Sequence, residues 1–109
     1  MLNFVICDDN LNILNKMSTM LENIFIKYNY DASISFKTNN VDNLLSYIDT
    51  NKIDVLILDI NLKSDKTGLE IAEILRKKYK DVYLIFTTGH LEYAMLAYKF
   101  KTFDYIAKP

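Results

Sequence analysis

Short apolar runs alternate with amphipathic stretches along the whole chain, and this alternation is what most constrains the fold. The runs that predict strands are residues 2–7, 32–37, 53–58, 82–86 and 103–107. Apolar residues recur between them at helical spacing, which predicts helices at about 10–28, 41–50, 68–79 and 91–99. Regular alternation of strand and helix predicts a parallel sheet with helices on both faces.

The composition of each run indicates where its strand lies in the sheet. Central strands of a parallel sheet are buried on both faces and are continuously apolar, as 2–7, 53–58 and 82–86 are. Residues 32–37 instead alternate polar and apolar side chains, which predicts an edge strand with one solvated face, and 103–107 takes the other edge. With right-handed crossovers the order is 2-1-3-4-5, a flavodoxin-like three-layer α/β/α fold.

Length and charge narrow the class of protein. The 109 residues fit one domain, 1–109, and the net charge of −1 provides no basic surface for nucleic acid or an anionic membrane. The single cysteine, Cys7, excludes an intramolecular disulfide and favours a reducing compartment. No apolar run approaches the ~20 residues of a spanning helix, and the N-terminus lacks a signal-peptide pattern, so a cytoplasmic location is expected.

Three carboxylates follow the strands between which the winding of this sheet reverses. Asp8 and Asp9 come directly after the first strand, and Asp59 comes after the third. Ligands of open α/β sheets bind at this reversal, beyond the carboxyl ends of the strands. We therefore expect the three side chains to converge on one crevice.

Converging carboxylates repel one another, so they take up protons or bind a cation. Hard oxygen ligands suit Mg²⁺, which leaves positions for water or phosphate oxygens. A carboxylate beside Mg²⁺ is also a competent nucleophile toward phosphorus and would form an aspartyl phosphate. Thr88 after the fourth strand and Lys108 after the fifth are candidates to neutralise a transferring phosphoryl group.

Each of these residues also has a purely structural interpretation, although Asp59 fits a strand-terminating turn poorly because it lies inside an apolar run that Leu62 continues. Asp8 and Asp9 could form a strand-to-helix turn, with Asp9 or Asn10 capping the helix. Thr88 could be a loop hydroxyl or a helix cap, and Lys108 a solvated lysine on an edge strand. Suitable groups at four strand ends of one sheet edge favour the functional interpretation.

Four motifs carry a resemblance to a known family. "ICDDN" (6–10), "LILDINL" (56–62), "FTTGH" (86–90) and "DYIAKP" (104–109) occur in this order over nearly the whole chain. Together they resemble the CheY-like receiver domains of bacterial two-component response regulators. The resemblance implies a signalling switch rather than an enzyme that turns over a substrate, phosphorylated by a sensor histidine kinase.

The resemblance implies a role for each matching residue. Asp59 matches the phosphoacceptor, Asp9 a direct Mg²⁺ ligand together with Asp59, and Asp8 a ligand that acts partly through water. Asn61 would offer its backbone carbonyl to the metal. Lys108 matches the lysine that binds the phosphoryl group.

The same resemblance implies a switch. Thr88 matches the hydroxyl that moves toward the phosphoryl group, and the small Gly89 leaves room for that group. Tyr105 matches the aromatic residue that turns inward, reshaping the face formed by 91–105. Pro109 matches a proline that is usually joined by a cis bond.

The loop "NLKSDKTG" and the stretch "FTTGHLEYAMLAY" resemble the accessory-gene-regulator type of the LytTR class. This implies a DNA-binding output domain and a role in transcription. Receivers continue past the Lys-Pro pair into a fifth helix, whereas this sequence ends at Pro109. We expect a truncated domain with a bare apolar surface near the first strand and helix, which invites homodimerisation.

Other functions fit the sequence less well. A haloacid-dehalogenase-like phosphatase also uses an Asp nucleophile with Mg²⁺, but it needs an acid where Asn61 stands. A degenerate receiver, acting only as an interaction module, would not keep every chemical position. A flavodoxin would place FMN phosphate against "CDDN", which would repel it, and His90 has no clustered partner as a metal ligand.

Overall fold

A computed structural model describes residues 1–59, 68–79 and 81–88, and the backbone of 104–107. The elements in chain order are β1 (Leu2–Cys7), α1 (Leu11–Lys27), β2 (Ala32–Thr38), α2 (Val41–Thr50), β3 (Val55–Asp59), α3 (Gly68–Lys78), β4 (Tyr83–Thr88) and β5 (Asp104–Ala107). Each agrees with its predicted element to within two residues. The predicted helix at 91–99 lies outside the described residues, as do Asn61, Gly89, His90, Lys108 and Pro109.

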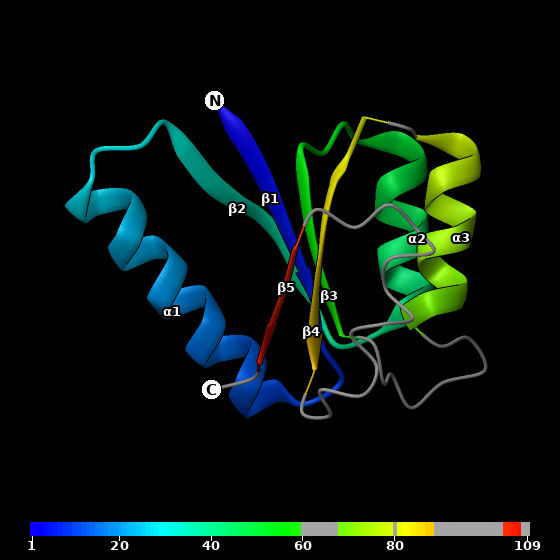
Figure 1. Cartoon of the computed structure of the whole chain (residues 1–109), viewed down its shortest axis with the longest axis horizontal. Helices are drawn as coiled ribbons and strands as arrows, with labels where there is room; N and C mark the ends of the chain where they lie inside the picture. The colour runs from blue at the N-terminus through cyan, green and yellow to red at the C-terminus, as the bar shows by residue number, and fades with distance from the viewer. Residues whose placement is uncertain (60–67, 80, 89–103, 108–109) are drawn as a thin grey trace.

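The five strands form one parallel sheet in the order β2-β1-β3-β4-β5. The predicted flavodoxin-like order is therefore confirmed. Figure 1 shows α1 on one face of the sheet and α2 with α3 on the other. Every residue of β3 is buried, as expected for the middle strand.

Alternate residues of the central strands supply two separate cores. Val5, Leu56 and Leu84 belong to the core under α2 and α3, whereas Ile6 and Ile57 belong to the core under α1. Because successive side chains of a strand point to opposite faces, this division assigns a face to every later position of the same strand.

The edge strand β2 departs from its predicted single apolar face. The pairing with β1 shifts after Phe4, which pairs with Ile34 while Val5 pairs with Phe36. Ser35 is the extra residue of this bulge. As a result Ile34 packs against the α1-side core and Phe36 against the opposite one. The alternation of polar and apolar residues in 32–37 predicted that Ile34 and Phe36 share one face of the sheet, and this prediction was wrong.

Asparagine side chains begin the first two helices. Oδ1 of Asn10 accepts hydrogen bonds from the backbone N–H groups of Asn12 and Ile13, at 2.9 and 3.2 Å. Oδ1 of Asn40 accepts one from Asn43, at 3.0 Å. These bonds satisfy N–H groups that have no partner within the helix. Of the capping alternatives for the first helix, Asn10 is therefore the cap.

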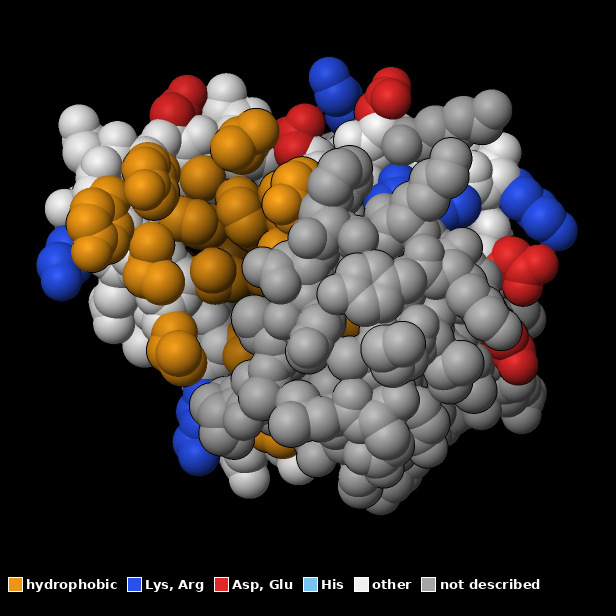
Figure 2. Space-filling view, viewed as in Figure 1, with side chains coloured by type: hydrophobic (Ala, Val, Ile, Leu, Met, Phe, Trp, Pro, Cys, Tyr) orange, Lys and Arg blue, Asp and Glu red, His pale blue; other side chains and the backbone are white. Residues whose placement is uncertain are grey.

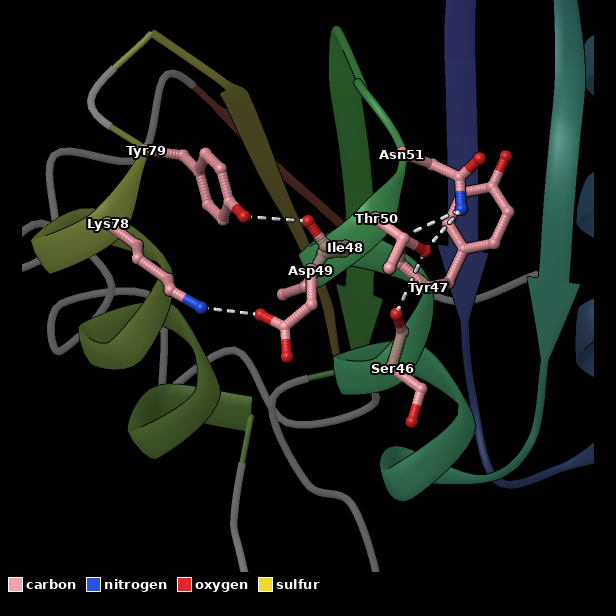
Figure 3. Close-up of polar contacts among 8 residues, drawn as sticks. All are labelled: Ser46, Tyr47, Ile48, Asp49, Thr50, Asn51, Lys78 and Tyr79. Carbon is pink, nitrogen blue, oxygen red and sulfur yellow. Dashed lines mark hydrogen bonds and ion pairs between the residues drawn. The ribbon is translucent and has the colours of Figure 1, made fainter.

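The C-terminal ends of α2 and α3 are joined by polar contacts (Figure 3). The Tyr79 hydroxyl donates a hydrogen bond of 2.8 Å to the carbonyl oxygen of Ile48. Nζ of Lys78 forms an ion pair with Asp49, and both side chains are more than half exposed. The side-chain amide of Asn51 closes α2 by donating to the carbonyl of Tyr47 at 3.1 Å.

Among the described residues, hydrophobic side chains on the α1 side of the sheet are left partly exposed. Hydrophobic side chains gather on this part of the surface in Figure 2. Ile85 and Leu21 are only partly buried against the α1-side core, and Ile24 is 41% exposed.

Among the described helices, none is long and apolar enough to cross a membrane.

Candidate metal centre

The three carboxylates predicted to converge do so. One carboxylate oxygen from each of Asp8, Asp9 and Asp59 lies within 4.8 Å of the other two. Asp8 and Asp59 are fully buried, and Asp9 is partly exposed. The cluster is therefore open to solvent at Asp9 and enclosed at the other two.

Asp8 is positioned by the turn from β1 into α1. Its backbone N–H donates to the carbonyl of Thr38 at 3.2 Å, which extends the β1–β2 pairing past the end of β1. Its Oδ1 accepts a hydrogen bond of 2.9 Å from the backbone N–H of Asn10. Since Asn10 caps the helix, Asp8 and Asp9 are not needed as caps.

Asp59 is positioned by the sheet itself. It is the last residue of β3 and pairs with Thr87 of β4. Leu58, the residue before it, is fully buried in the core under α2 and α3. Alternation therefore directs Asp59 to the other face, which is the face of Ile57 and of the α1-side core.

Negative charge from the cluster acts on the neighbouring thiol. Burial first, and then the charges of Asp8, Asp59 and Asp9 in that order of effect, together raise the pKa of Cys7 from 9.0 to about 12. A thiol of this kind is a structural side chain of the core rather than a nucleophile. Cys7 is therefore a buried residue of β1.

Carboxylate oxygens with a partly open side are the donor set that Mg²⁺ prefers. Opposite ligands of an octahedral Mg²⁺ lie about 4.2 Å apart, twice the usual bond length. The separations within the cluster reach at most 4.8 Å, so a small inward movement, or a water in place of one carboxylate, fits the ion. The residues present therefore suit a magnesium ion.

The remaining predicted residues are described only in part. The backbone of Thr88 ends β4 and pairs with Ala107, and the backbone of Tyr105 pairs with Phe86. The side chains of Thr88 and Tyr105, and the whole of Asn61 and Lys108, lie outside what the structure describes. Thr87 was not predicted, because its approach to Asp59 depends on the β3–β4 register.

Comparison with known proteins agrees with this arrangement. The sequence profile of the response regulator receiver domain matches residues 4–109. The chain is 32% identical to sensory transduction protein LytT of Bacillus anthracis over 109 residues, which are all of this chain and 42% of LytT. It is 33% identical to LytR of Staphylococcus saprophyticus over 105 residues, which are 96% of this chain and 39% of LytR. The chain thus spans about two fifths of the length of these relatives.

A solved structure shares the fold. Response regulator TrrA of Thermotoga maritima, in complex with Mg²⁺ and beryllium fluoride, superposes with a TM-score of 0.83 at 26% identity, covering 100% of this chain and 88% of that one. Profile, relatives and fold agree with the motif resemblance, and they do not favour a phosphatase of the haloacid-dehalogenase class. This chain belongs to the response regulator receiver domain family.

Proposed function

We propose that the chain is a phosphorylation-driven switch in which Asp59 accepts a phosphoryl group in a Mg²⁺-dependent reaction. The observation that carries the proposal is the approach of Asp8, Asp9 and Asp59 to within 4.8 Å at the carboxyl ends of β1 and β3. The Mg²⁺-beryllium fluoride complex of TrrA supports it, since that relative binds this pair of groups.

The proposed reaction is a transfer from a phosphohistidine of a sensor kinase. A carboxylate oxygen of Asp59 forms a bond to phosphorus while the bond from phosphorus to the histidine nitrogen breaks, and the imidazole leaves with the electron pair. Asp8, Asp9, Asp59 and the backbone carbonyl of Asn61 would hold Mg²⁺, which supplies positive charge for the phosphoryl oxygens. Thr88 and Lys108 bind these oxygens as well.

The charge of the phosphoryl group then changes the conformation of a more distant face of the chain. Thr88 moves toward the new charge, Tyr105 turns inward, and the face formed by 91–105 changes shape. The positions of Thr88 and Tyr105 support a coupled movement of the two residues, because they lie on the adjacent strands β4 and β5. The chain catalyses only its own phosphorylation and dephosphorylation.

The wider context of the switch is also a proposal. The partners would be a sensor histidine kinase and a C-terminal DNA-binding output domain of the LytTR class, in a cytoplasmic regulator of transcription. Relatives that are two to three times longer support an output domain, and one of them is the transcriptional regulatory protein NatR of Bacillus subtilis. The apolar surface beside α1 supports homodimerisation of the 109-residue chain.

A small phosphodonor tests the central claim. The chain is incubated with acetyl phosphate and Mg²⁺, and its intact mass is measured. We expect a gain of one phosphate in the wild type, no gain in Asp59→Asn, and no gain when EDTA replaces Mg²⁺. Asp42→Asn, which changes an exposed acid at the start of α2, serves as the matched control and should be labelled normally. Labelling that persists in Asp59→Asn would show that Asp59 is not the phosphoacceptor.

A further inference from the structure

The hydroxyl of Thr87 is a buried polar group with no hydrogen-bond partner among the described residues. Thr87 is 1% exposed, and its Oγ1 makes no hydrogen bond to any residue that the structure describes. Buried hydroxyls are nearly always hydrogen-bonded, because the loss of water is otherwise uncompensated. A buried hydroxyl without a protein partner therefore indicates a missing ligand when it faces a binding site.

The sheet register directs this hydroxyl toward the acidic cluster. Thr87 and Asp59 are paired residues on the adjacent parallel strands β4 and β3. Neighbouring strands lie about 4.8 Å apart. Ile57 and Ile85, two residues earlier on the same strands, both pack on the α1 side of the sheet. Alternation therefore brings the side chains of Asp59 and Thr87 out on that same face, next to each other.

Thr87 and the metal carboxylates flank Asp59 from opposite sides. β3 lies between β1 and β4, so Asp8 approaches Asp59 from the β1 side and Thr87 from the β4 side. A cation belongs on the side with the carboxylates. On the β4 side, the described residues supply the Thr87 hydroxyl as a donor and add no acid to the cluster, which suits an anionic oxygen such as one of a phosphoryl group on Asp59.

We propose that Thr87 is a further phosphoryl-binding residue, whose hydroxyl donates a hydrogen bond to an oxygen of the phosphoryl group carried by Asp59. This role is additional to that of Thr88, the hydroxyl implied by the family resemblance. It rests on the proposed function of Asp59 as phosphoacceptor. Until the phosphoryl group is present, the hydroxyl stays without a partner in the described part of the chain.

The isosteric variant Thr87→Val separates ligand binding from packing. Valine keeps the shape of the side chain and replaces the hydroxyl with a methyl group. We expect the affinity for beryllium fluoride, in saturating Mg²⁺, to fall about ten- to a hundredfold, the effect of losing a hydrogen bond to a charged group. The affinity for Mg²⁺ alone should stay within about twofold, since the hydroxyl lies on the β4 side of Asp59, whereas Asp8 lies on the β1 side.

Thermal unfolding gives a second readout. The difference in melting temperature between Thr87→Val and the wild type should change sign when the ligand is added. Without ligand, Thr87→Val should melt at the same temperature as the wild type or higher, because it removes an unpartnered buried hydroxyl. With Mg²⁺ and beryllium fluoride it should melt lower, because its ligand binds more weakly. Thr87→Ser keeps the hydroxyl and should restore the affinity. Ser18→Ala removes another buried hydroxyl, which donates to the carbonyl of Leu14 in α1, and should leave the affinity unchanged.

The outcomes distinguish this proposal from the proposed function. If the wild type binds beryllium fluoride and Thr87→Val binds it equally well, Thr87 has no such role, while Asp59 remains the phosphoacceptor. Failure of Thr87→Ser to restore binding would also overturn the role of the hydroxyl. If the wild type binds no beryllium fluoride and is not labelled at Asp59, the proposed function fails and this inference fails with it.

Discussion

The backbone N–H of Asn10 donates a hydrogen bond of 2.9 Å to the buried carboxylate of Asp8, while the Asn10 side chain caps α1. One residue therefore connects the start of the helix to a predicted metal ligand. The turn that presents Asp8 depends on the cap, because a frayed first turn of α1 would release the N–H group that holds the carboxylate.

Substitution of the cap tests this connection. We expect Asn10→Ala to lower the free energy of unfolding by about 1 kcal/mol, the usual effect of losing an N-cap. It should also weaken Mg²⁺ binding. Asn40→Ala removes the corresponding cap of α2 and should destabilise the chain similarly without affecting Mg²⁺. Urea unfolding and Mg²⁺ titration of both variants provide the measurements, and equal Mg²⁺ affinities would show that the Asn10 side chain does not support the site.

Charge repulsion within the cluster predicts that Asp8→Asn changes the stability of the chain in opposite directions without and with metal. Asp8→Asn removes one of the converging charges and retains an oxygen to accept from Asn10. In EDTA we expect it to be more stable than the wild type by about 1 kcal/mol, from relief of like-charge repulsion. In saturating Mg²⁺ the order should reverse, because the wild type binds the ion more tightly. Thermal unfolding in both buffers measures this, and an unchanged order would contradict a metal site at Asp8.

The raised pKa of Cys7 predicts low reactivity. Burial and the neighbouring carboxylates raise this pKa to about 12, so at pH 8 the folded chain has a far smaller thiolate fraction than an ordinary cysteine. We expect iodoacetamide to modify the native chain slowly at pH 8 and the urea-unfolded chain quickly. Intact mass over time measures both rates. Rapid modification of the native chain would show that the thiol is accessible and ionised.

The predictable part of this structure is what composition and strand order determine. Continuous apolar strands placed β1, β3 and β4 at the centre, and this placement alone brings Asp8 and Asp59 together. The bulge at Ser35 and the pairing of Thr87 with Asp59 could not be predicted, because both depend on the register between distant strands. No local residue type signals either one.

The first residue of β3 also could not be predicted from the sequence pattern. The apolar run suggested a strand from Ile53, but the strand begins at Val55. The carboxylate of Asp54 accepts a hydrogen bond of 2.8 Å from the backbone N–H of Asn3, and its backbone N–H donates to the Asn3 carbonyl at 3.0 Å. This contact across 51 residues fixes the boundary, and a hydrophobicity pattern contains no information about it.

The two contacts between the ends of α2 and α3 should differ in their effect on stability. Tyr79→Phe leaves the partly buried carbonyl of Ile48 without its donor and should lower the free energy of unfolding by about 1 kcal/mol. Lys78→Gln removes an ion pair whose side chains are more than half exposed, and should leave stability nearly unchanged. Urea unfolding of each variant measures the difference. A larger loss in Lys78→Gln would reverse this ranking.

The apolar surface beside α1 predicts self-association of the 109-residue chain. Ile24 and Ile26 lie on roughly opposite sides of α1, because two residues of a helix span about 200°. Ile24 is three residues beyond Leu21, on the side of the helix next to the α1-side core, and Ile26 is directed to solvent with 79% exposure.

The apparent mass from light scattering, measured over a range of concentrations, then shows which side of α1 takes part in association. We expect the apparent mass of the wild type to rise toward that of a dimer, since contiguous apolar area is buried by association. Ile24→Lys places a charge at the edge of the apolar surface and should keep the chain monomeric, whereas Ile26→Lys should associate like the wild type. Equal behaviour of the two variants would show that association does not use this side of α1. A wild type that stays monomeric at every concentration would show that the exposed apolar surface does not drive dimerisation.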